Sequence, residues 1–95
     1  MSYPKRILET AAHLIDDRGA DYGGVEDNFS TIAHVANMAL GRSLTPHDVA
    51  IVMMAVKLAR LRTSPHKLDN YLDLINYTAF AATMRPGELI PETES

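Results

Sequence analysis

The chain has 95 residues, a formal net charge of −3, 46% hydrophobic residues and no cysteine. This length suits one domain with a small core, for which association with another chain is a common way to bury more apolar surface. The lack of cysteine excludes disulfides and thiolate metal sites. The net acidity argues against nucleic-acid binding, which usually needs a basic face.

The hydropathy of the chain gives no sign of a membrane partner. No uncharged apolar stretch approaches the roughly 20 residues needed to cross a bilayer. The first ten residues, MSYPKRILET, lack the apolar run of a signal peptide. We therefore expect a cytoplasmic protein.

The first part of the chain predicts one helix and a glycine-rich loop. Apolar residues recur at helical spacing after Pro4 and predict a helix over residues 4–17, with Gly19 as its stop. Residues 18–26 hold three of the five glycines. Glycine lets the backbone turn sharply or approach a ligand closely, so this segment is either a plain connection or part of a binding site.

The next two predicted helices have clear ends. Apolar residues from Phe29 to Leu40 predict a second helix, with Asp27 as its N-cap and Gly41 as its stop. Thr45 and Asp48 have the spacing of a capping box, and Pro46 between them suits the first position of a helix. They predict a third helix that runs to about residue 62. Residues 49–56 carry no charged side chain. A helix that is apolar nearly all round is normally central in a bundle or shared with a partner.

A fourth helix follows, with Ser64 as its N-cap, Pro65 in its first turn and its end near Met84. Its apolar stripe is predicted to contain Leu68, Leu72, Ile75 and Ala79. Residues 87–95 are polar and contain proline, which predicts a flexible tail. Residues 1–86 thus form a single all-α domain, predicted to be an antiparallel four-helix bundle.

Four charged residues flank the turn between the last two predicted helices. Lys57 and Arg60 share one face of the third helix, and Asp69 and Asp73 share one face of the fourth. In an antiparallel hairpin, Arg60 falls near Asp69 and Lys57 near Asp73. The arrangement is either a pair of interhelical salt bridges or a site where carboxylates hold a divalent metal for a phosphate-bearing ligand.

Motifs along most of the chain carry a resemblance to a known family. They are Tyr22-Gly23 followed by Asn28-Phe29, the segment Thr45 to Val49, the segment Lys57 to Leu61, and the series His66, Asp69, Asp73, Tyr77. In this order they resemble a family of small helical bacteriophage proteins, which implies a place in the host cytoplasm. The segment 73–77 also looks like the end of phage domains associated with nucleotide modification.

The chain is more distantly similar to MazG-like all-α nucleoside triphosphate pyrophosphohydrolases, which are oligomeric helical bundles that use Mg²⁺. This resemblance implies that Mg²⁺ or Mn²⁺ is a cofactor and that a nucleotide is the substrate. It implies catalytic roles for Lys57 and Arg60 beside the phosphates. The remaining implied roles are metal binding by Glu26, Asp69 and Asp73, and nucleotide contacts by Tyr22, Asn28 and Tyr77.

Three functions stay open at this point. The first is Mg²⁺-dependent pyrophosphohydrolysis of a nucleoside triphosphate. The second is binding or sequestration of a nucleotide without turnover, because the chain lacks the Glu-Glu-x-x-Glu sequence typical of MazG-like enzymes. The third is a helical interaction module, in which the apolar third helix docks on a partner or on a second copy of the chain.

Overall fold

The computed structural model describes residues 2–22 and 24–86, and within them the side chains of all but residues 18–22 and 25–27. Four α-helices make up this part of the chain, which contains no strand: α1 (Tyr3–Tyr22), α2 (Val25–Leu40), α3 (Pro46–Thr63) and α4 (Leu68–Thr83). The prediction of an all-α protein is therefore confirmed for the described residues. None of these helices is long and apolar enough to cross a membrane. The predicted tail, residues 87–95, lies outside the described part.

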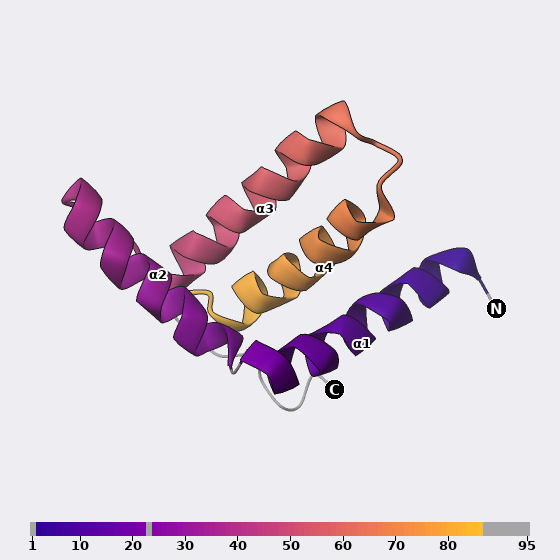
Figure 1. The fold of residues 1–95 in the computed structure, drawn as a ribbon, viewed down its shortest axis with the longest axis horizontal. Helices are drawn as coiled ribbons and strands as arrows, with labels where there is room; N and C mark the ends of the chain where they lie inside the picture. The colour runs from indigo at the N-terminus through magenta and orange to yellow at the C-terminus, as the bar shows by residue number, and fades with distance from the viewer. Residues whose placement is uncertain (1, 23, 87–95) are drawn as a thin grey trace.

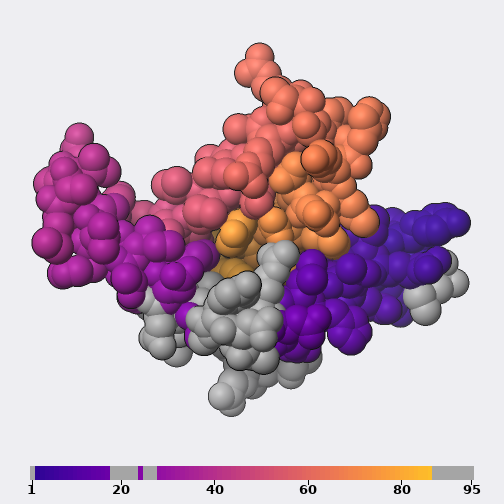
Figure 2. Space-filling model, in the orientation of Figure 1, coloured from indigo at the N-terminus to yellow at the C-terminus, as the bar shows by residue number. Residues whose placement is uncertain are grey.

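Helix α4 lies between α3 and α1, and its contact with α3 is the most extensive in the structure (Figure 1). Helix α2 packs on α3 through Phe29 and Ala33, which share a cluster with Val49 and Ala50. The C-terminal part of α2 then projects away from α3 and leaves a notch between the two helices, which the space-filling view shows (Figure 2).

The glycine-rich segment is largely helical, so the predicted loop over residues 18–26 is wrong. Helix α1 continues through Gly19 to Tyr22, and α2 begins at Val25 with Gly24, not Asp27, as its N-cap. A glycine inside a helix costs about 1 kcal/mol, whereas each further residue of a formed helix adds a hydrogen bond. One glycine therefore does not have to stop a helix.

The connection between α2 and α3 is as the sequence predicts. Gly41 has φ 64° and its N–H donates to the Asn37 carbonyl, so a residue without a side chain suits the end of α2. Thr45 and Asp48 form the capping box: the Asp48 N–H donates to Thr45 Oγ1 at 3.1 Å and the Thr45 N–H donates to Asp48 Oδ2 at 2.9 Å. The Asn37 side chain also forms two hydrogen bonds with the backbone of Leu44: its Nδ2 donates to the Leu44 carbonyl, and its Oδ1 accepts from the Leu44 N–H.

The connection between α3 and α4 differs from the prediction, because Ser64 ends α3 rather than beginning α4. Its N–H donates to the Arg60 carbonyl at 2.8 Å, and α4 begins four residues later at Leu68. The Tyr71 hydroxyl donates to the Pro65 carbonyl at 3.0 Å and fastens the turn to α4. The sequence Ser64-Pro65 is typical of a helix start, but in this structure both residues belong to the turn between α3 and α4.

The hydrophobic core of the described residues is small. One buried cluster consists of Phe29, Ala33, Val49, Ala50 and Ala81, with Met53, Met54, Tyr77, Phe80 and Met84 packed against it. Ala11 and Leu72 are buried as well. The predicted apolar stripe of α4 is buried only in part: Leu72 is 4% exposed, whereas Leu68 is 48% exposed and Ala79 is exposed. Polar residues instead take much of the buried face.

Candidate functional site

Three polar residues lie on the buried face of α4. Asn70, Asp73 and Asn76 follow one another at intervals of three residues, and each is at most 9% exposed. This spacing keeps them on one side of a helix. Because α4 lies between α3 and α1, the buried polar side chains can reach both neighbouring helices. We call these three residues and Lys57 the polar cluster.

Lys57 enters the cluster from α3. Its Nζ lies 2.7 Å from Asp73 Oδ2, and the two side chains are only 9% and 11% exposed. Lys57 is buried because it shares a face of α3 with Ala50 and Met54, the face that packs against α4. The predicted ion pair between Lys57 and Asp73 is thus confirmed, and it is a buried pair rather than a surface one.

Asn76 joins α4 to α1. Its Nδ2 donates to the backbone carbonyl of Ala11 at 2.9 Å, and both residues are buried. The cluster therefore connects the three helices α1, α3 and α4 through polar contacts. Asn70 and Asn76 were not among the predicted site residues, although both fit the periodicity that places Asp73 on this face.

Arg60 and Asp69 lie outside the cluster. Both are exposed, and the structure records no ion pair between these two described residues, so the second predicted salt bridge is wrong. Asp69 is in the first turn of α4, where a carboxylate is favoured by the helix dipole. Arg60 follows Lys57 by one turn of α3 and is exposed.

The residues predicted to contact a nucleotide are not all near the cluster. Tyr77 packs on Phe29 with ring centroids 6.1 Å apart, in the core beside α2. Asn28 is exposed in the first turn of α2. The side chains of Tyr22 and Glu26 lie outside those that the structure describes.

The described side chains do not fit a divalent metal by themselves. Asp73 already faces the ammonium of Lys57 at 2.7 Å, and Asp69 is exposed one turn away. No group of three His, Cys, Asp or Glu residues suited to a metal occurs among the described residues. Since the Glu26 side chain is not described, the metal role of Glu26, Asp69 and Asp73 stays a prediction.

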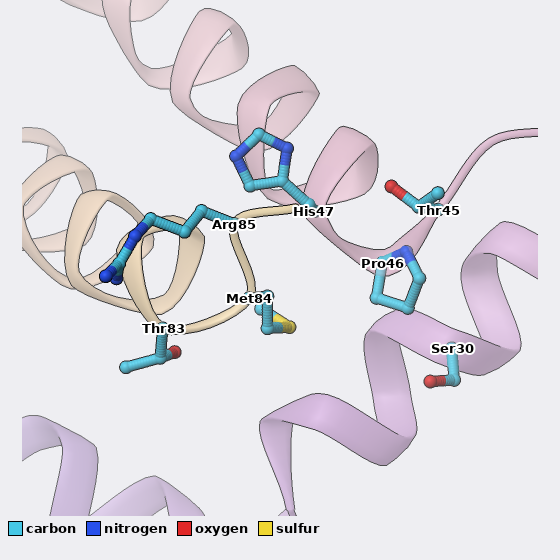
Figure 3. A pocket seen from close by; sticks show the side chains of 7 residues that line it. All are labelled: Ser30, Thr45, Pro46, His47, Thr83, Met84 and Arg85. Atoms are coloured by element: carbon cyan, nitrogen blue, oxygen red, sulfur yellow. The ribbon is translucent and has the colours of Figure 1, made fainter. Parts of the chain in front are cut away.

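A cavity of about 330 Å³ lies elsewhere, between Ser30 of α2, the start of α3 and the end of α4 (Figure 3). Two of its polar residues have structural roles. Thr45 caps α3, and Arg85 Nη1 donates to the Ala82 carbonyl at 2.8 Å. The neighbouring Asp48 has its pKa lowered, chiefly because its carboxylate accepts the Thr45 N–H. None of the predicted site residues lines this cavity.

Comparisons with known proteins identify the family. The family described as "Domain of unknown function (DUF6378)" matches residues 6–85. The Gene 55 protein of Mycobacterium phage L5 is 32% identical over 90 residues, which cover 93% of this chain and 55% of the relative. The Gene 55 protein of Mycobacterium phage D29 is 33% identical over 72 residues, 75% of this chain and 48% of the relative.

The chain spans about half the length of these phage relatives. No solved structure matches it. The match over residues 6–85 takes in all of α2, α3 and α4 and most of α1, and so includes every residue of the polar cluster. The chain belongs to the DUF6378 family, and its relatives include phage proteins.

Proposed function

We propose that the protein binds a nucleotide through the phosphates, at the side of α3 that carries Lys57 and Arg60. The observation that supports this most is the buried pair of Lys57 with Asp73. Burying two charges usually costs about as much desolvation energy as their attraction recovers, so such a pair adds little to the net stability of the fold. Buried charged groups with defined partners occur often at functional sites.

The chemistry of Lys57 suits a phosphate. A lysine ammonium has three N–H donors, and the pair with Asp73 takes one of them. The other two can donate to phosphate oxygens while Asp73 keeps the ammonium in place. Arg60, one turn farther along α3, adds a guanidinium that matches the geometry of a phosphate and is already exposed to a ligand.

Asn70 gives the site a neutral polar group. Its side-chain amide offers two donors and one acceptor, as the edge of a base or a sugar hydroxyl requires. Binding of this kind needs no metal from the protein.

Thermal unfolding in the presence of each common NTP, dNTP and NDP tests the proposal. A ligand at one hundred times its Kd stabilises the folded state by about 2.7 kcal/mol, which in a domain of this size raises Tm on the order of 10 °C. Arg60→Gln should reduce the shift, because Arg60 is exposed and its loss leaves the fold intact. Lys5→Gln, an exposed change on α1, should leave it unchanged. No shift with any nucleotide overturns the proposal.

Mg²⁺-dependent pyrophosphohydrolysis is the second candidate function. It is favoured by two carboxylates one turn apart on α4, Asp69 and Asp73, to which Glu26 would have to add a further ligand. Pyrophosphate release from a bound nucleotide with Mg²⁺ or Mn²⁺ measures it directly. Release that depends on Glu26 and Asp69 supports this candidate, whereas binding without release supports a nucleotide-sequestering protein.

A further inference from the structure

One face of α3 is apolar and exposed along its length. Ala50 and Lys57 mark the inner face, which is buried against the rest of the protein. About half a turn away, Ile51, Val52 and Leu58 are 46%, 53% and 55% exposed. Ala55 and Ala59 are exposed on the same side. We call these five residues the outer face of α3.

The outer face is symmetric about Ala55 in a way that suits a second copy packed antiparallel. Ile51 and Ala59 are four residues to either side of Ala55, and Val52 and Leu58 are three. A two-fold axis at Ala55 would place Ile51 opposite Ala59 of the other copy, a large side chain against a small one. Val52 would meet Leu58, and the small Ala55 lets the two helices approach closely at the crossing.

The charges at the two ends of α3 obey the same symmetry. Asp48 and Arg62 are each seven residues, or two turns, from Ala55 and so lie on the same side of the helix. In the antiparallel pair, Asp48 of each copy would face Arg62 of the other. A parallel pair would instead set Asp48 against Asp48 and Arg62 against Arg62.

We propose that a second copy of this chain docks on the outer face of α3 and forms an antiparallel α3–α3 pair with its two-fold axis at Ala55. A stable dimer buries about 800 Å² on each partner. An 18-residue helix offers a face on the order of 27 Å by 10 Å, so other elements must contribute.

The projecting end of α2 is suited to supply the remaining area. It lies across the notch from α3 in Figure 2, and Val35, Met38 and Leu40 are 58%, 75% and 66% exposed. Residues 28–40 contain no Asp, Glu, Lys or Arg, so a second copy can pack on this segment without repulsion between like charges. This inference is independent of the proposed nucleotide binding, which uses Lys57 and Arg60 and none of the five residues of the outer face.

Cysteine cross-linking of the full chain tests the geometry, because the natural sequence contains no cysteine. Ala55→Cys places two thiols at the two-fold axis, where they are close enough for a disulfide. Mild oxidation should convert most of this variant to a covalent dimer. The control Asp17→Cys, at an exposed site on α1, should stay monomeric. Failure of Ala55→Cys to cross-link, or equal cross-linking of the control, overturns the proposed axis.

The mass in solution and a charge reversal complete the test. Light scattering of the natural chain should give about twice 10.5 kDa. Arg62→Glu should raise the dimer Kd by more than tenfold, since it opposes Asp48, and Arg42→Glu in the α2–α3 connection should not. Circular dichroism confirms that both variants keep their helices. A natural chain that is monomeric up to the highest concentration reached contradicts the proposal, as does a dimer that Arg62→Glu leaves unchanged.

Discussion

Removing one partner of the Lys57–Asp73 pair should be among the most destabilising changes in this protein. Lys57→Met leaves the Asp73 carboxylate buried without its cation, and Asp73→Leu leaves the ammonium alone. The two side chains are 9% and 11% exposed, so water does little to replace the missing partner. Breaking a buried pair in this way costs about 3–5 kcal/mol. Domains of this size have a total stability of about 5–15 kcal/mol, so each single variant should be only marginally folded.

The double variant Lys57→Met/Asp73→Leu should behave very differently. It replaces both charges by apolar side chains of similar size, a change that is often neutral or stabilising. Urea unfolding followed by circular dichroism gives the free energies for the four proteins of this double-mutant cycle. Arg60→Met and Asp69→Leu form a matched control of exposed, unpaired residues and should each change stability by at most about 0.5 kcal/mol.

Two outcomes of the double-mutant cycle would contradict a strongly interacting buried pair. Single variants that cost less than about 1 kcal/mol would show that the pair behaves like a surface salt bridge. A double variant that costs as much as the two single changes together would show that Lys57 and Asp73 do not act on each other. Either result would also remove the main support for a functional role of the polar cluster.

Two further predictions concern polar contacts other than the Lys57–Asp73 pair. Asn76→Leu removes the hydrogen bond to the Ala11 carbonyl and should cost about 1 kcal/mol, with faster amide hydrogen exchange in α1 than in α3. The pKa of Asp48 is lowered in the folded state, so its carboxylate adds stability above the ordinary value of 3.8, and this contribution is lost as the pH falls through the lower folded pKa. The difference in Tm between the natural chain and Asp48→Ala should therefore be largest above about pH 4 and should shrink on acidification.

Local signals in the sequence predicted the parts of the fold that depend on local chemistry. The capping box of Thr45 and Asp48 and the left-handed Gly41 are set by residues a few positions apart, and both occur as predicted. The local signals at Gly19 and Ser64 were misleading: Gly19 was predicted to end the first helix, and Ser64 was predicted to begin the fourth. Helix α1 continues through Gly19, and the α3–α4 hairpin uses Ser64 in its turn. The outcome at these positions depends on the neighbouring helices rather than on the residue itself.

The candidate site was predictable in part for the same reason. An antiparallel α3–α4 hairpin places Lys57 opposite Asp73 once the turn is known, and the sequence predicted that pair. The polar cluster as a whole was not predicted, because apolar residues were assigned to the buried face of α4. Asn76 is buried through its contact with Ala11, which is 65 residues away in sequence, and no local pattern indicates that contact.

Asn70, Asp73 and Asn76 take places on α4 that a purely structural core would give to large apolar side chains. Several large hydrophobic side chains of α2 and α3 are exposed instead, and the proposed second copy would cover them.

Calorimetric titration of the most stabilising nucleotide into the natural chain and into Lys57→Met/Asp73→Leu measures whether the polar cluster binds that nucleotide. The double variant should stay folded but lose at least tenfold in affinity, because the ammonium that meets the phosphate is gone. Equal binding by the two proteins, or no binding by the natural chain to any nucleotide, would contradict the assignment of the polar cluster as a nucleotide site.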